Sequence, residues 1–499
     1  MKLKKYLYAL VAFCAMEAFT GCSDWLDYTP KDKETEEQTF ASKQGFYTAV
    51  NGVYNRLIDD VMYGKNLTWG MLDLMGKRYQ TPGRLSYTSG SRSLDASIIN
   101  NYTYTDIDFV TIIEDIWEEA YATILNVNVI LDNAEQKRGT VLVESDYNLI
   151  KGDMLALRAF LHFDMLRLFG PVYSRTPEQL SIPYNDGREA QVYEQLPAQS
   201  VIYDHLIPDL NEAEACLAEY DPVVTEGPLA STLDNEDNFT RYRQLRLNYY
   251  ATILLKARIY LWAGDTANAL AEAQKLTDNP QVSLWFPFVD ANTLLGNTIN
   301  PDRTFSTECL FGFYDSGRNT IYTGSFDSSL TSSSLLQPST GYLSTLFTSG
   351  GDYRNQSQWN GNIFQKYKGI ELTEEQEEDG TYPFYTYFMP LMHLSEAYYI
   401  AAECLINSNP SQARSYLNTI LTARGATLLP ENVSTTNLLN EIKYEYMRET
   451  WGEGQIFYMF KRNYQVLTGV FDANKSVAGT NPSVNIYVLP LPESELINR

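Results

Sequence analysis

The chain has 499 residues and carries 62 acidic against 38 basic side chains, a formal net charge of −24. So acidic a chain excludes nucleic acid from the expected partners, because phosphate binding needs clustered Lys and Arg, and it offers no charge attraction to anionic lipid. The length allows a large core, and the 37 tyrosines suit half-buried positions and sugar-stacking platforms alike, because each has an apolar face and a polar tip.

The N-terminus predicts an export signal that ends at a lipid anchor. Three lysines within the first five residues precede an apolar stretch, 6–16, with the length of a signal-peptide core. That stretch falls short of the roughly 20 residues that cross a bilayer. Gly21 directly before Cys22 resembles the bacterial lipobox, so we expect residues 1–21 to be removed and the Cys22 thiol to be acylated. An ordinary signal peptide with an incidental cysteine is the alternative.

Beyond the signal, we expect an acidic, extended tether at 22–38 and a single domain at 39–499. Loss of residues 1–21 removes three lysines and one glutamate, which changes the net charge to −26. The first half of the domain is predicted to be mostly helical, because apolar residues recur three and four positions apart. The segments with this spacing are 46–58, 117–133, 153–169 and 203–217.

Two later segments, 247–276 and 391–424, look like copies of one helix pair. Each has an apolar stripe, a short turn and a return helix, and small alanines let the two helices approach closely. In the first pair the turn is Ala263-Gly264-Asp265. Each unit spans about 34 residues, the tetratricopeptide period. We interpret the two as a degenerate repeat; two unrelated helical hairpins are the alternative, since the full repeat consensus is absent.

Residues 278–389 lie between the two pairs and show no sustained helical period. They are rich in Ser, Thr, Asn, Gly and aromatic residues, and 310–314 predicts a strand. Irregular stretches of this length inside a compact domain usually have a function. We therefore expect the ligand-recognition elements here.

Six motifs in chain order resemble the SusD/RagB family of outer-membrane lipoproteins from Bacteroidetes, over nearly the whole length of the chain. Each motif by itself is weak evidence for the family, and the resemblance depends on all six occurring in the family's order. The motifs are CSDWLD at 22–27 followed by 40–54; LRAF at 157–160 leading to LFGPV at 168–172; LKARIYL at 255–261; LSEAYYIAAE at 394–403 with Ala-Arg-Gly at 423–425; 445–462 with WGEG at 451–454; and LPLPE at 489–493.

The chain departs from the family pattern at four positions. The family usually has arginine where His393, Tyr446 and Ile456 stand, and aspartate where Met459 stands. These positions carry structural ion pairs in relatives, so their joint loss predicts an altered network in the core.

The resemblance implies an all-α fold with tetratricopeptide-like helix pairs, long irregular loop regions and minor β structure. It also implies a non-catalytic lipoprotein on the outer face of the outer membrane, held there by its lipid anchor alone. Such a protein captures glycan oligosaccharides, or peptides in some relatives, and delivers them to a SusC-like TonB-dependent transporter. No cofactor or metal is expected.

The residues give little support to a catalytic role. The chain has three histidines, of which His162 and His393 lie in apolar helical patterns, and no HExxH, GxSxG or P-loop motif occurs. Its cysteines show no zinc-ligand spacing, and the acidic run at 234–238 lacks the glycine of a calcium loop. A glycosidase needs only two carboxylates far apart in sequence, so a surface glycoside hydrolase stays open, as does a helical scaffold that binds only proteins.

Two stretches combine aromatic faces, which can stack on sugar C–H edges, with polar neighbours. The first lies near Trp69, the expected main platform, and the second lies within 311–322. The resemblance supplies no fixed contact motif, so these ligand-binding residues are predicted from chemistry and location. They are Trp69, Asp73, Arg78, Tyr79, Tyr314, Arg318 and Tyr322.

Overall fold

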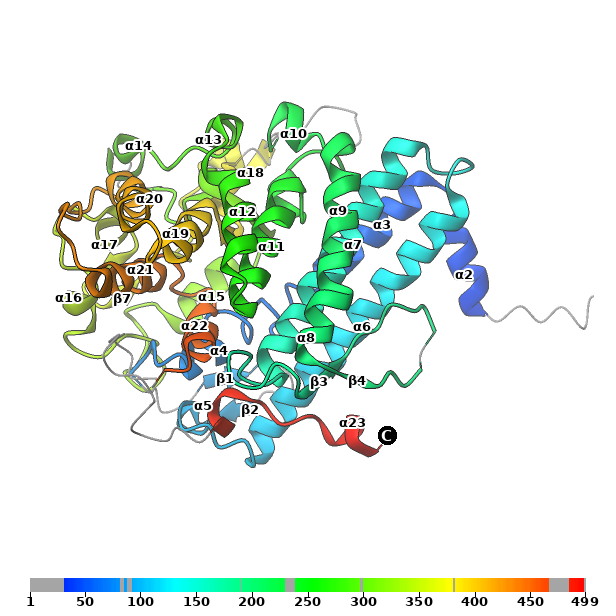
Figure 1. Cartoon of the computed structure of the whole chain (residues 1–499), viewed down its shortest axis with the longest axis horizontal. Helices are drawn as coiled ribbons and strands as arrows, with labels where there is room; N and C mark the ends of the chain where they lie inside the picture. Colours follow the sequence, from blue (N-terminus) through cyan, green and yellow to red (C-terminus); the bar gives the residue numbers. More distant parts are fainter. Residues whose placement is uncertain are drawn as a thin grey trace, which may run out of the picture.

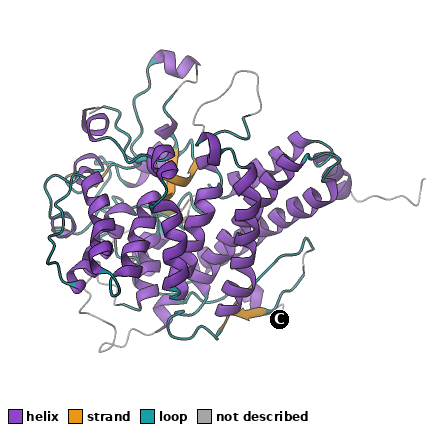
Figure 2. Ribbon diagram, turned by 45° about the horizontal axis from the view of Figure 1, so that its top comes forward, coloured by secondary structure: helices purple, strands orange, loops and turns teal. Residues whose placement is uncertain are grey.

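Helices make up most of the protein (Figure 2). The computed structural model describes residues 31–80, 85–87, 92–189, 191–228, 238–296, 299–379, 382–465 and 484–497. The predicted signal peptide and Cys22 lie outside these residues. Within them the strands form four two-stranded sheets, and no helix is both long enough and apolar enough to span a membrane. The predicted all-α class is confirmed.

The first half contains the long helices that the apolar spacing predicts. Helix α6 packs on α7, and α7 packs on α9, so the three run side by side (Figure 1). Both α6 and α7 begin earlier than predicted; the Asp106 side chain caps α6 by accepting a hydrogen bond from the Asp108 backbone N–H. The bounds of this half are α3 (Lys43–Arg56), α4 (Met71–Met75), β1 (Leu85–Tyr87), β2 (Arg92–Leu94), α5 (Ala96–Asn100), α6 (Ile107–Lys137), α7 (Glu144–Phe169), β3 (Leu180–Pro183), β4 (Gln195–Pro197), α8 (Ala198–Ser200), η2 (Val201–Leu206), α9 (Ile207–Tyr220), α10 (Val223–Glu226) and η3 (Arg243–Leu245).

Helix α7 is buried on every side from Gly152 to its end. Gly152 allows α9 to approach closely, because a Cβ at this position would lie 2.6 Å from Leu217 Cγ. A helix without a solvent face must pair its polar side chains. Arg158 accordingly donates two hydrogen bonds of 2.7 Å to Asp209 on α9.

Both predicted helix pairs are present, as α11 (Tyr249–Ala263) with α12 (Thr266–Thr277) and α19 (Leu394–Leu405) with α20 (Pro410–Ala423). Gly264 ends α11 with φ of 75°, a conformation that favours glycine, and Asp265 caps α12. Because α12 packs against α19, the two pairs stack in succession. Helices α21 (Thr435–Glu449) and α22 (Gln455–Asn463) follow, then η6 (Val484–Tyr487) and α23 (Glu493–Ile497).

Between the pairs the chain forms short elements joined by loops, as predicted for 278–389. The expected strand is β5, which pairs antiparallel with β8 immediately before α19 and so connects the irregular region to the scaffold. The bounds are α13 (Pro280–Trp285), α14 (Ala291–Gly296), η4 (Ser306–Glu308), β5 (Cys309–Tyr314), α15 (Arg318–Ser325), α16 (Tyr342–Leu346), α17 (Tyr353–Ser357), β6 (Trp359–Asn360), β7 (Ile363–Phe364), α18 (Glu374–Asp379), η5 (Phe384–Thr386) and β8 (Phe388–His393).

The end of the predicted tether is helical where we expected an extended chain. Helix α2 (Lys31–Thr39) includes Glu36, which accepts hydrogen bonds from Arg188 Nη2 at 2.8 Å and from Asn133 Nδ2 at 2.7 Å. These contacts fix the end of the segment to the domain.

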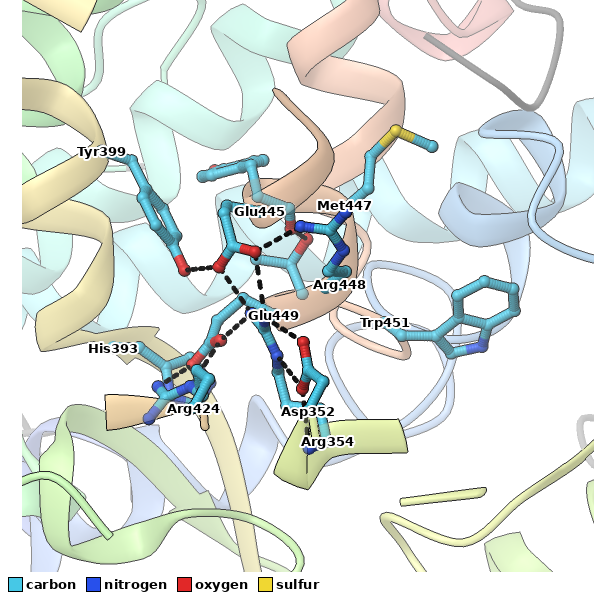
Figure 3. Close-up of polar contacts among 12 residues, drawn as sticks. Asp352, Arg354, His393, Tyr399, Arg424, Glu445, Met447, Arg448, Glu449 and Trp451 are labelled. Carbon is cyan, nitrogen blue, oxygen red and sulfur yellow. Dashed lines mark hydrogen bonds and ion pairs between the residues drawn. The ribbon is translucent and has the colours of Figure 1, made fainter. Parts of the chain in front are cut away.

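A buried ion network joins the irregular region to α20 and α21 (Figure 3). Arg354 on α17 binds Asp352 (2.7 Å), Glu445 (2.9 Å) and Glu449 (3.0 Å). Arg424, at the end of α20, binds the same Glu449 at 2.5 Å and also pairs with Glu308. Burial by itself would raise the pKa of Glu449, but Arg424 and Arg354 hold it below its usual value.

His393 pairs with Glu453 within the same core. Its Nε2 lies 2.8 Å from Glu453 Oε1 and its Nδ1 lies 3.2 Å from Cys309 Sγ. Burial would lower the pKa of His393, but Cys309 and Glu453 raise it well above its usual value. A histidine that pairs with a carboxylate thus stands where the family usually has arginine. Two of the other three departures, Tyr446 and Met459, line a small cavity in the core.

Replacement of Glu449 by glutamine should destabilise the protein strongly, because it leaves two buried arginines with too few carboxylates. Breaking a buried pair in this way costs about 3–5 kcal/mol. Glu441→Gln is the matched control, since Glu441 pairs with Arg448 near the surface, where loss of an ion pair costs about 1 kcal/mol or less. Urea denaturation measures both; equal losses would contradict the central place of Glu449.

Candidate ligand-binding surface around Tyr314

The four residues predicted near the first platform lie together, but in the core. Trp69, Asp73, Arg78 and Tyr79 are each 5% exposed or less. Trp69 Nε1 donates to the Gly64 carbonyl at 2.8 Å. No face of this indole is free to stack on a sugar.

Contacts of Asp73 and Arg78 hold α4 and the residues that follow it against the WGEG segment at 451–454. Asp73 accepts a hydrogen bond from the Gly452 N–H at 2.8 Å, and burial raises its pKa to about 6. The Arg78 guanidinium lies 3.8 Å from the centre of the Trp451 ring and donates to Tyr342 Oη at 2.9 Å. These interactions are structural.

Two of the three residues predicted in 311–322 are also buried. Arg318 donates to the Phe388 carbonyl at 3.0 Å, and burial lowers its pKa to about 10. Tyr322 accepts a hydrogen bond from Gln365 Nε2 at 3.1 Å. Both residues form hydrogen bonds that connect separate segments of the irregular region in its interior.

Tyr314, at the end of β5, is the predicted residue that reaches the surface. It is 38% exposed and forms a 3.0 Å hydrogen bond with the hydroxyl of Tyr382, which is also 38% exposed. The Tyr387 ring lies 5.2 Å from the rings of both. Nearby, Tyr242 stacks on Phe384 with ring centres 5.9 Å apart. These five residues are called the tyrosine surface below.

Tyr314 borders two hollows. The larger, of about 1090 Å³, lies between the end of α3, the 58–66 loop, α6 and the residues that follow Tyr314. The smaller, of about 250 Å³, lies between α3, Arg246 and the end of β5. Tyr314 lines both. Because Tyr314 borders both hollows, a ligand that contacts its ring can extend into either one. This arrangement suits a ligand longer than one sugar ring.

Polar side chains outnumber apolar ones in the lining of the larger hollow, and acidic side chains outnumber basic ones. Its hydrogen-bonding side chains include Asn55 and Asn66, and its one basic side chain among the described residues, Arg56, is already paired with Glu119 at 2.7 Å. The other acidic residues in its lining are Asp59, Asp60, Asp115 and Asp315. Such a lining can bond neutral hydroxyls or a cationic group and repels anions.

The prediction missed most of the tyrosine surface. A signal was present, because residues 382–388 read Tyr-Pro-Phe-Tyr-Thr-Tyr-Phe, with five aromatic residues in seven. We placed recognition within 278–389 without choosing this run. Its nearness to Tyr314 depends on the pairing of β5 with β8, which no local pattern reveals.

A third hollow lies elsewhere, lined by α6 and the 191–193 segment. It measures about 490 Å³ and includes Trp117, Tyr121 and Tyr193. Trp117 is only 5% exposed. This hollow is a weaker candidate for stacking than Tyr314.

Two buried clusters resemble reactive centres without the access that such centres need. Cys309, His393 and Glu453 have the connectivity of a thiol–imidazole–carboxylate triad, but all three are buried, and burial raises the pKa of Cys309 to about 11, so the thiolate is scarce. Ligand atoms of Glu308, His393 and Glu449 lie within 4.8 Å of one another. Both of these carboxylates are already ion-paired with Arg424.

The protein has an all-α fold with one irregular face. Several solved structures have a similar fold. A SusD superfamily protein from Bacteroides thetaiotaomicron is 21% identical, with a TM-score of 0.65 over 91% of this chain and 98% of that one. A SusD-like carbohydrate binding protein from Bacteroides vulgatus is 19% identical, with a TM-score of 0.63 over 92% and 96% of the two chains. A SusD superfamily protein from Bacteroides fragilis is 18% identical, with a TM-score of 0.64 over 92% and 98%.

Two family models match successive parts of the chain. The model described as SusD family matches residues 303–497, and the model described as starch-binding associating with outer membrane matches residues 24–221. The chain belongs to the SusD family. A search of curated proteins finds no match.

Because Trp69 is buried, its replacement should affect the stability of the protein. Trp69→Ala is expected to lower the free energy of unfolding by about 3–5 kcal/mol, because it removes a packed indole from the core. Tyr314→Ala is the control and should lower it less, by about 1–2 kcal/mol, because it removes a half-exposed ring and one hydrogen bond. Thermal unfolding followed by circular dichroism compares the two; a Trp69→Ala protein as stable as the wild type would contradict the buried placement.

Proposed function

We propose that the protein binds oligosaccharides at the tyrosine surface and does not cleave them. The observation that carries this proposal is the exposed Tyr314–Tyr382 pair beside two hollows. Flat aromatic faces are suited to the C–H edges of sugar rings. Hydrogen bonds to sugar hydroxyls exchange with those to water and each gain only about 0.5–1.5 kcal/mol, so stacking on Tyr314 is expected to dominate the affinity.

The comparisons support a carbohydrate as the ligand class. One matching family model is described as starch-binding, and one similar structure is a carbohydrate binding protein. A peptide is the second candidate, because the acidic lining of the larger hollow would accept a basic side chain. A hydrolase is the third, since the same hollow holds several carboxylates and a glycosidase needs two.

We further propose that the protein is lipid-anchored at Cys22 on the outer membrane and delivers its ligand to a TonB-dependent transporter of the SusC type. The lipobox-like Gly21-Cys22 and the description of one family model as associating with the outer membrane support this. Purification of the tagged protein in mild detergent should recover a large β-barrel partner. Recovery of this chain alone at native expression would contradict the partnership.

Tyr314→Ala should weaken the best oligosaccharide about tenfold, the equivalent of about 1.4 kcal/mol. Calorimetry of the protein from Ser23 onward against a panel of glycans and peptides identifies that ligand. Tyr203→Ala is the matched control, because Tyr203 is 42% exposed but lies on η2, outside both hollows. Equal affinity in the Tyr314 and Tyr203 variants would place the site elsewhere, and product formation on the same panel would favour a hydrolase.

Cys22→Ala should release the protein from the membrane fraction, because the acyl chains supply the attachment at about 0.8 kcal/mol per buried CH₂. Cell fractionation followed by immunoblotting measures the change, and a Cys216→Ala variant controls for loss of an unrelated thiol. Retention of the Cys22→Ala protein in the membrane, with unchanged labelling at the cell surface, would show that the anchor is not at Cys22.

A further inference from the structure

The larger hollow beside Tyr314 carries more negative than positive charge, and part of that charge is already paired. Glu119 pairs with Arg56 at 2.7 Å. Asp60 is attracted by Lys65, which lies just outside the lining. The charge that is open to a ligand must therefore come from other carboxylates in the lining.

Asp59 and Asp315 line the same hollow and have no ion-pair partner among the described residues. Asp59 accepts a hydrogen bond of 2.9 Å from the Val61 N–H, and Asp315 accepts one of 2.7 Å from the Gly317 N–H. Burial raises the pKa of Asp315, although the Gly317 N–H and Arg318 oppose the rise. A cation at this point would stabilise the charged carboxylate.

Asn66 gives an independent indication of what the hollow binds. Its side chain lines the hollow, and the residue is only 3% exposed. Nδ2 donates to the Val61 carbonyl at 3.3 Å, whereas Oδ1 has no hydrogen-bond partner among the described residues. A buried acceptor without a donor is unfavourable. The amide oxygen and the two carboxylates thus favour a ligand group that donates hydrogen bonds and carries positive charge.

An ammonium group has this combination, because it offers three donors and no acceptor. Water could donate to Asn66 but would leave the charge of Asp59 and Asp315. A metal ion fits less well, since Ca²⁺ requires several oxygen ligands at one point. Within the described part of the chain, no three carboxylates of this hollow gather closely enough to hold such an ion.

Tyr314 connects the charge to the aromatic platform. It directly precedes Asp315 in the chain, and both residues line the larger hollow. A sugar in contact with the Tyr314 ring can therefore place a substituent at Asp315. The 58–66 loop supplies Asp59 and Asn66 on the same lining, for substituents on further sugar rings.

We propose that the larger hollow binds the ammonium groups of amino sugars, so that the tyrosine surface prefers oligosaccharides whose amino groups are not acetylated. This inference rests on the proposed binding of oligosaccharides at that surface. A sugar ring stacks on Tyr314 and its ammonium donates to Asp315. Acetylation removes the positive charge and with it the preference.

Calorimetry of the protein from Ser23 onward tests the proposal with two oligomers of equal length, β-1,4-linked glucosamine and its fully N-acetylated form. The two share their rings and linkage and differ in charge. The glucosamine oligomer should bind about tenfold more tightly, the effect of one hydrogen bond between charged groups. Equal affinities, or tighter binding of the N-acetylated oligomer, would overturn the proposal.

The same experiment separates this inference from the proposed function. Binding of an uncharged glycan but of neither glucosamine oligomer would overturn the inference alone. Absence of binding by every glycan would overturn both. A lysine oligopeptide of equal charge controls for general attraction to an acidic protein, and if it binds as tightly as the glucosamine oligomer, the hollow does not select amino sugars.

Asp315→Asn assigns the preference to the hollow. Asparagine keeps an oxygen that can accept from the Gly317 N–H and removes the charge, so the preference for the glucosamine oligomer should disappear. Asp204→Asn is the matched control and should retain it, because Asp204 is exposed on η2, outside both hollows. Loss of the preference in both variants, or in neither, would contradict a site at Asp315.

Salt dependence gives a test on the wild-type protein alone. The preference should narrow as the sodium chloride concentration rises, because salt screens charges and leaves stacking unchanged. Calorimetry with both oligomers at low and at high salt measures this change. A preference that stays the same would show that the size of the acetyl group causes it, and would overturn the assignment to charge.

Discussion

Two arginines, Arg354 and Arg424, meet at the buried carboxylate of Glu449, and the placement of the proposed ligand-binding face depends on that junction. A buried ion pair adds little net stability over an apolar core, whereas the loss of one partner is severe. The consequence is geometric: Arg424 also binds Glu308, the residue directly before β5, and β5 ends at Tyr314. The network therefore fixes the strand that presents the tyrosine surface.

The same network explains how this sequence accommodates its departures from the family pattern. Glu453 accepts at His393 Nε2 and raises the pKa of the imidazole, so a basic group remains paired at this position without an arginine. At Tyr446 and Met459 the usual charges are absent, and these residues line the cavity between α11, α21 and α22. The altered core thus keeps an ion pair at His393 and leaves a small cavity beside Tyr446 and Met459.

Local patterns predicted the helices and their pairing, because these depend on residues close together in the sequence. Apolar spacing marks each helix, Gly264 ends α11, and Asp265 caps α12. They did not predict which aromatic residues reach the surface. Trp69 stands among polar neighbours in the sequence, yet its N–H bonds the Gly64 carbonyl and the ring packs on Phe326. Tyr382 lies beside Tyr314 only because β5 and β8 pair across the irregular region. Burial and long-range strand pairing are properties of the whole fold.

Hydrogen–deuterium exchange, with and without the best oligosaccharide, tests most directly whether this face is the capture site. The account predicts slower exchange in the ligand-bound protein at 58–66, 312–317 and 382–388, with little change in α7, which is buried in both states. Protection confined to 117–125 and 191–193 would place the ligand in the third hollow, beside Trp117 and Tyr193, and would contradict the account.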